Sequence, residues 1–156
     1  IGRIGDDTTV NVGQIEGGRA SNIVPDYCEV SGELRSFSHK KALEELAKVE
    51  QIFAKEAEKR GGSIEFIRDI CYQAYKTDEN ESVVKEFQKA CTACGIKSSL
   101  IATFGGSDQN KMSEHGIPGI VMASAMHQVH SCQEYTEVSE MAQVAGIVSE
   151  LLQMKE

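Results

Sequence analysis

The first part of the chain begins with a pattern of apolar and polar residues that is typical of strands. Residues 8–15 and 27–37 alternate β-branched or aromatic residues with polar ones, as half-buried strands do. The stretch between them is rich in glycine and other turn-forming residues, which predicts a broad loop. We therefore expect a pair of strands joined by this loop.

A spacing of apolar residues that is typical of a helix follows the strand pair. From Leu43 to Ala57 the apolar residues recur every three or four positions. Ser38 is placed to cap this helix, and the Gly61-Gly62 pair is placed to end it. Residues 63–75 return to β-branched and aromatic residues in irregular alternation. The order predicted up to about residue 75 is ββαβ.

The pattern changes after Tyr75. Asp78 and Glu81 have the spacing of a capping box, and apolar residues then recur at helical spacing up to Gly95. A last amphipathic pattern begins near Ser139 and predicts a C-terminal helix.

Short apolar runs lie between these two helices. Residues 98–103 and 118–124 suit buried parallel strands, and a short polar helix that includes residues 111–114 is expected between them. The second half thus reads αβαβα. We predict an α/β protein of two units, an antiparallel sheet with one helix over 1–75 and part of a parallel sheet with helices on both faces over 76–156.

Composition and charge narrow the class of protein. With 40% apolar and 26% charged residues, the 156-residue chain should fold. A formal charge of −8 with only 16 basic residues argues against binding to nucleic acid or to an anionic membrane. There is no apolar run of about 20 residues and no signal-peptide pattern, so we expect a cytoplasmic protein. Its five cysteines are an odd number, which favours reduced thiols.

The stretch HQVHSCQEY, residues 127–135, concentrates metal-binding residue types. His130 follows an apolar strand and a loop, where α/β sheets place ligand-binding groups. An imidazole is a good zinc ligand, but a site needs three or four donors, so an ordinary loop histidine is the alternative. His127 could be a second ligand only if the loop turns helically.

Three further features each have a structural explanation beside a functional one. Cys91 and Cys94 have metal or redox spacing, yet both fall on the apolar stripe of a helix, which favours core packing. FGGSDQN (104–110) could cradle an anion, or it could be a tight turn with Ser107 or Asp108 as helix cap. Arg35, beside Glu29 and Glu33 on a polar strand face, could simply form a surface ion pair.

Taken together, three stretches resemble one known family. GRIGDDTTVNVGQIEGGRASNIVPDYCEVSGELRS, FGGSDQNKMSEHGIPGIVM and HSCQEY are similar to the C-terminal part of a peptidase T-like tripeptidase of the di-zinc metallopeptidase family, with carboxypeptidase, aminoacylase and succinyl-diaminopimelate desuccinylase relatives. The resemblance covers nearly the whole chain. It implies a partial lid and dimerisation domain over 1–75, with α+β structure, and the final portion of a three-layer α/β/α catalytic domain over 76–156.

The resemblance also implies roles for individual residues. His130 matches the last zinc ligand, and Asn22 and Arg35 match lid residues that bind substrate. A loop bordering the active site is matched by Gly105, Gly106, Ser107 and Asp108. The family's remaining ligands (a His-x-Asp motif, a bridging aspartate) and its Glu-Glu pair with the general base are not found here, nor are the lid's first strand and helix. Phe104 stands where the closest relatives usually have glycine.

The function implied is that of a partial enzyme. We expect the parent protein to be a hydrolase, a zinc metallopeptidase that cleaves short peptides with two zinc ions and forms a homodimer through its lid. No catalytic residue is assigned within this chain, and the chain alone is expected to be inactive. The alternative is a stand-alone binding or dimerisation module that has lost catalysis.

Overall fold

The protein is described by a computed structural model that covers residues 2–153. Its internal contacts divide the chain into two compact units, one ending at Tyr75 and the other starting at Lys76. Among residues 2–153, no helix combines the length and the apolar character needed to cross a bilayer.

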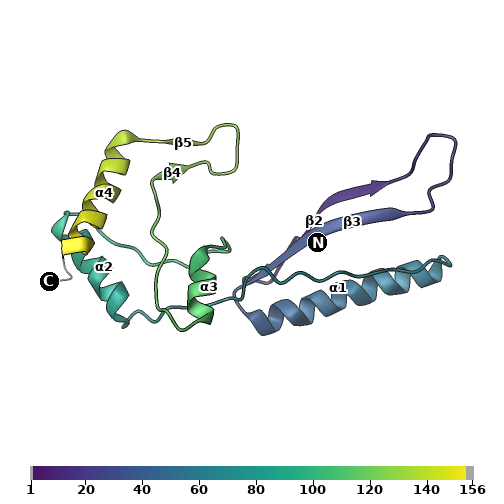
Figure 1. Ribbon diagram of the computed structural model, residues 1–156, viewed down its shortest axis with the longest axis horizontal. Coiled ribbons are helices and arrows are strands. Elements are labelled where there is room, and N and C mark those ends of the chain that lie inside the picture. The colour runs from purple at the N-terminus through teal and green to yellow at the C-terminus, as the bar shows by residue number, and fades with distance from the viewer. Residues whose placement is uncertain (1, 154–156) are drawn as a thin grey trace. The chain divides into compact units, whose positions relative to one another are not determined.

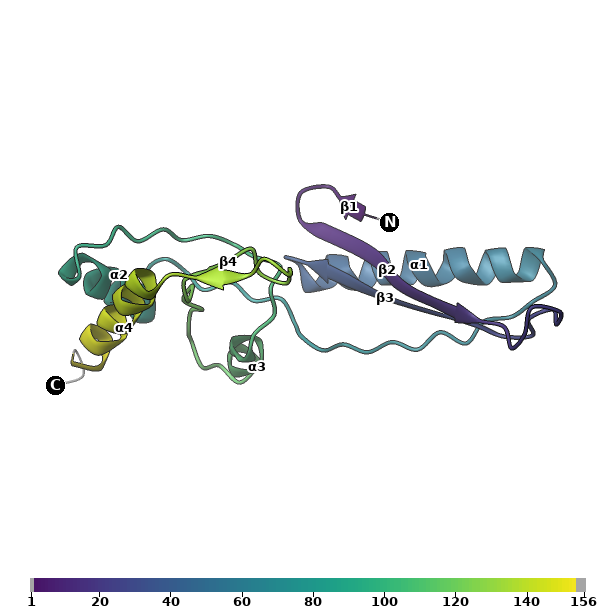
Figure 2. The same cartoon turned by 90° about the horizontal axis from the view of Figure 1, so that it is seen from above.

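An antiparallel sheet forms the basis of the first unit. Its strands, in the order β1-β2-β3, are β1 (Gly2–Ile4), β2 (Thr8–Gly17) and β3 (Cys28–Ser36). The long β2–β3 hairpin is confirmed (Figures 1 and 2). Its register shifts once, between Val12 and Gln14. Thr8 and Val10 are buried, whereas Arg35 on the other face is exposed, because neighbouring residues of a strand point to opposite faces.

Helix α1 (His39–Lys59) covers one face of this sheet and packs on β3. Its boundaries are those predicted. The Ser38 hydroxyl accepts a hydrogen bond from the Lys41 amide, and Gly61 takes the left-handed φ of +75° that ends a helix without a Cβ clash.

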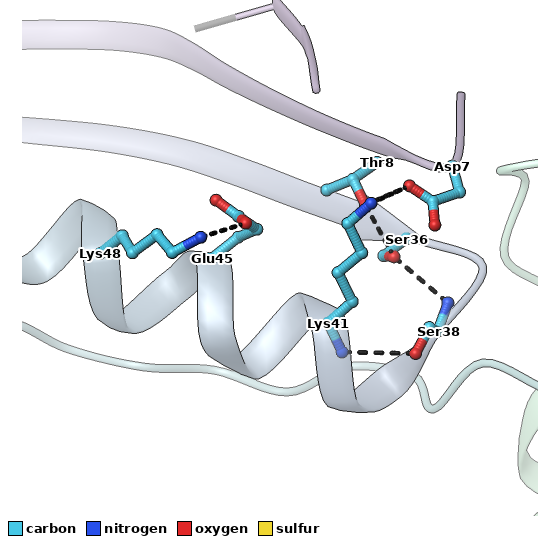
Figure 3. Close-up of polar contacts among 7 residues, drawn as sticks. All are labelled: Asp7, Thr8, Ser36, Ser38, Lys41, Glu45 and Lys48. Atoms are coloured by element: carbon cyan, nitrogen blue, oxygen red, sulfur yellow. Dashed lines mark hydrogen bonds and ion pairs between the residues drawn. The ribbon is translucent and has the colours of Figure 1, made fainter. Parts of the chain in front are cut away.

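A chain of hydrogen bonds ties the start of α1 to the sheet (Figure 3). The Ser38 amide donates to the Ser36 hydroxyl, which lies 2.9 Å from the hydroxyl of buried Thr8. Thr8 in turn donates to the Asp7 carboxylate, which also pairs with Lys41. The Asp7 carboxylate therefore accepts the last hydrogen bond of this series.

The fourth element predicted for the first unit is absent. Residues 63–75 are extended but form no ladder with any strand among residues 2–153, so the expected ββαβ order is observed as βββα (Figure 2). An ion pair between Arg68 and Glu50 joins the segment to α1. A β-rich sequence becomes a strand only when a partner takes up its backbone hydrogen bonds, and here none does.

Two helices and a small core organise the second unit. Helix α2 (Ser82–Ala93) packs against α4 (Val138–Gln153) around Ala90, Cys91 and Ile147. Gly95 ends α2 with φ +71°, as predicted. The predicted capping box does not form, because the Asp78 carboxylate accepts instead from the Asn80 amide two residues on.

Both parallel strands predicted for this unit are also absent. Residues 98–103 and 118–124 carry no strand pairing among the residues described, for the same reason as residues 63–75. The ladder that does form is short and antiparallel, between β4 (Met126–His127) and β5 (Tyr135–Thr136). The short polar helix is α3 (Asp108–Glu114). Mixed α/β structure is thus confirmed, but three predicted strands do not form among the described residues, and β1, β4 and β5 lie outside the predicted ones.

Candidate functional site

His130 lies in the loop that joins β4 to β5. Gln128 and His130 both have left-handed backbones, with φ of 50° and 63°. Such angles are uncommon outside glycine and are held here by local hydrogen bonds. The His130 amide donates to Glu134 Oε2 at 2.9 Å, and the Ser131 hydroxyl donates to the Gln128 carbonyl at 2.7 Å. The loop is therefore tightly tied, and the His130 side chain is exposed at it.

His127 makes different contacts from His130. Its Nε2 lies 2.5 Å from Glu140 Oε2 in the first turn of α4, and its ring stacks on Tyr135 with centroids 4.8 Å apart. The imidazole is thus engaged in holding the hairpin to the helix. The His127 side chain therefore supports the loop, whereas the His130 imidazole is exposed.

His130 can supply only one of the several donor atoms that a metal centre needs. Within residues 2–153, no three histidine, cysteine or acidic side chains come together as a metal site. Nor do the ring nitrogens of His130 make a hydrogen bond to any other described residue. The role of His130 as a metal ligand stays a prediction.

The glycine loop adopts the helix-capping arrangement. Ser107 is the N-cap of α3, and its amide donates to Asn110 Oδ1 at 3.0 Å. The Gly105 amide donates to the Thr103 hydroxyl at 3.2 Å, which leaves Gly106 and Asp108 at the turn into the helix. Of the two alternatives for this motif, the tight turn is what these hydrogen bonds describe. A role beside substrate stays a prediction.

Asn22 and Arg35 lie towards opposite ends of the β2–β3 hairpin. Asn22 sits in the loop after β2, whereas Arg35 is seven residues past the start of β3, roughly 23 Å further along the strand. A tripeptide is only about 10 Å long when fully extended. Binding of one peptide by both side chains stays a prediction.

Arg35 is paired with Glu33 on the polar face of β3. Its Nε donates to Glu33 Oε1 at 3.0 Å and its Nη2 donates to Oε2 at 2.9 Å. This contact raises the pKa of the guanidinium and holds the pKa of the Glu33 carboxyl below its usual value. The predicted surface ion pair exists. Its partner is Glu33, and its two-pronged geometry was not anticipated from the sequence.

The cysteine pair belongs to the core. Cys91 is 1% exposed, packed with Ala90 and Ile147, and burial raises the pKa of its thiol. Cys94 is half-buried beside the same cluster. Core packing, the explanation favoured on sequence grounds, is confirmed.

Comparison with known proteins shows what the chain is similar to. A family model described as a peptidase dimerisation domain matches residues 1–61. The uncharacterized protein YqjE of Bacillus subtilis (strain 168) is 32% identical over 153 residues, which are 98% of this chain and 41% of the relative.

Solved structures give the same result. Aminopeptidase PepT from Bacillus cereus ATCC 10987 is 32% identical with a TM-score of 0.82, over 98% of this chain and 41% of PepT. A tripeptidase from Staphylococcus aureus is 27% identical with a TM-score of 0.89, over 99% of this chain and 41% of the tripeptidase. Bacillus subtilis YXEP, described as a dinuclear metal-binding peptidase of the M20 family, shares the fold at 17% identity with a TM-score of 0.71, over 94% and 42% of the two chains.

These matches confirm the mixed α/β fold and the resemblance to a peptidase T-like enzyme. The chain spans about two fifths of the length of the relatives it matches.

Proposed function

From the correspondence of this chain to the C-terminal part of peptidase T-like enzymes of the M20 family, we propose that it is part of a zinc aminotripeptidase. The observation that carries the proposal is the match to a tripeptidase over 99% of the chain with a TM-score of 0.89. The peptidase dimerisation domain at residues 1–61 supports a parent enzyme that acts as a homodimer.

We assign His130 as one ligand of a two-metal centre completed by residues outside this chain. Paired zinc ions polarise a peptide carbonyl and lower the pKa of a bound water. The contribution of this chain is to present the His130 imidazole from a loop whose backbone is fixed by Glu134 and Ser131. The turn into α3, with Gly105, Gly106, Ser107 and Asp108, borders the bound peptide in this proposal.

Arg35 is assigned to the free C-terminal carboxylate of the peptide. Its planar guanidinium offers paired donors that match a carboxylate, and the contact with Glu33 has the same two-pronged geometry. Asn22, in the loop between β2 and β3, is assigned to a contact with the backbone of the bound peptide.

The experiment is hydrolysis of a tripeptide panel by the complete polypeptide that contains this chain. We expect release of the N-terminal residue, loss of activity with a chelator, and recovery with zinc. No turnover of any tripeptide by the zinc-loaded protein would reject the peptidase assignment. It would favour the alternative of a dimerisation module without catalysis, which the match over residues 1–61 alone would also satisfy.

A further inference from the structure

The contact between Glu33 and Arg35 has a geometry that resembles recognition of a carboxylate ligand. The two residues are separated by one position on β3, so their side chains lie on the same face of the sheet. Both carboxylate oxygens of Glu33 are engaged, one by Nε at 3.0 Å and one by Nη2 at 2.9 Å. Glu33 thus occupies the Nε and Nη2 edge of the Arg35 guanidinium, the edge that would otherwise match the carboxylate of a ligand.

This internal contact is weak enough to open. The side chains of Arg35 and Glu33 are 45% and 56% exposed, and exposed ion pairs of this kind stabilise proteins little. Water can replace Arg35 around the Glu33 carboxylate when that side chain rotates away. A peptide carboxylate can therefore exchange with Glu33 at the same donors.

The surrounding face favours an anion once Glu33 has moved. The strand register sets Thr9 opposite Arg35, and Arg3 opposite Thr9, so two arginines flank one threonine in a row across the sheet. Opposite neighbours in a sheet have Cβ atoms about 5 Å apart, so the Cβ atoms of Arg3 and Arg35 lie about 10 Å apart, a separation that two long arginine side chains can bridge through a shared ligand. The residue opposite Glu33 is the neutral Asn11.

We propose that Glu33 is an internal competitor for the peptide carboxylate at Arg35. It sets how strongly the enzyme prefers peptides with a free C-terminus, because each such peptide must displace the Glu33 carboxylate before it binds. This inference rests on the proposed peptidase function and on the assignment of Arg35.

The test compares steady-state kinetics of the complete protein with Glu33→Gln, Glu33→Ala and Glu56→Gln variants. Each is assayed on one tripeptide as the free acid and as its C-terminal amide. Glu56 is a matched control, since it lies in the same unit, is 47% exposed and pairs with Arg60. Removing a competitor of this strength should lower KM for the free acid about two- to five-fold, with kcat unchanged.

The amide substrate separates this role from a structural one. KM for the amide should not move in either Glu33 variant, because an amide does not compete for the guanidinium edge as a carboxylate does. Glu56→Gln should change neither substrate. An unchanged or raised KM for the free acid in both Glu33 variants would overturn the inference while leaving the peptidase function standing. Absence of tripeptide hydrolysis in the unchanged protein would instead reject both together.

Discussion

His127 Nε2 lies 2.5 Å from Glu140 Oε2, a contact that joins strand β4 to the first turn of α4. The His127 ring also stacks on the ring of Tyr135 in β5. Together the two contacts close the base of the loop that carries His130. The loop is therefore held from both of its strands and from the helix that follows.

Replacing His127 by alanine should loosen this loop. The stacked pair contributes about 0.5–1.5 kcal/mol, and the part-buried hydrogen bond between His127 and Glu140 about 0.5–1.5 kcal/mol. Amides of residues 127–135 should then exchange with deuterium roughly five- to ten-fold faster, since local opening governs their exchange. Hydrogen exchange followed by mass spectrometry measures this. His115→Ala, which removes an exposed imidazole on α3's C-cap, is the control and should leave the loop unchanged.

The stability of the first unit should depend on pH through Asp7. Hydrogen bonding to Lys41 is the largest cause that lowers the pKa of Asp7 below its ordinary 3.8. A carboxyl with a depressed pKa contributes stability that is full above its unfolded value and is lost as the pH falls through its folded value. We expect the urea concentration at the unfolding midpoint to decrease as the pH is lowered below about 4. This acid-dependent loss of stability should be smaller in Asp7→Asn.

The neighbouring Asp6→Asn variant is the control for Asp7→Asn. It removes the same charge one residue away from the hydrogen-bonded series. If both variants show the same acid dependence as the unchanged protein, the Asp7–Lys41 contact does not contribute to stability as described.

Close approach of the two strands at Gly32 should make this glycine irreplaceable. A Cβ at Gly32 would lie 2.5 Å from the backbone oxygen of Asn11, so the strands would have to separate. Gly32→Ala should cost about 1–3 kcal/mol of stability, the usual range for overpacking. Gly13→Ala, where the nearest atom would be 3.8 Å away, should be tolerated. Equal urea midpoints for the two variants would contradict the register of β2 and β3.

Arg35→Ala tests the assignment of the carboxylate contact in the complete enzyme. A hydrogen bond to a charged group contributes about 1.5–3 kcal/mol, so kcat/KM for a free-acid tripeptide should fall roughly ten- to a hundred-fold. The C-terminal amide of the same peptide should be affected much less. Arg60→Ala, which removes an exposed arginine at the end of α1, should preserve both activities. Near-normal activity of Arg35→Ala on free acids would leave only the surface ion pair.

Local signals in the sequence predicted the helices well. Ser38, Gly61 and Gly95 act through hydrogen bonds and backbone angles within a few residues, so their effects can be read from neighbouring positions. The β2–β3 hairpin was predictable for a similar reason, because its two strands are adjacent in sequence and their alternation shows which face is buried.

Strands that need distant partners could not be predicted in this way. Residues 63–75, 98–103 and 118–124 have the composition of strands, yet composition does not say which segment will pair with them. The contact of Glu33 with both donors of Arg35 was likewise hidden. Spacing placed them on one face, but only the side-chain conformations show that the carboxylate and guanidinium meet edge to edge.

The central claim is that His130 serves as a metal ligand in a tripeptidase of which this chain is a part. The most direct measurement is the zinc content and tripeptide turnover of the complete protein, compared between His130→Ala and the control His115→Ala. Loss of one zinc per chain and a fall in kcat of more than about a hundred-fold are predicted for His130→Ala, since changes to mere supporting residues already cost 10–100-fold. Full zinc content with unchanged turnover in His130→Ala would contradict the claim.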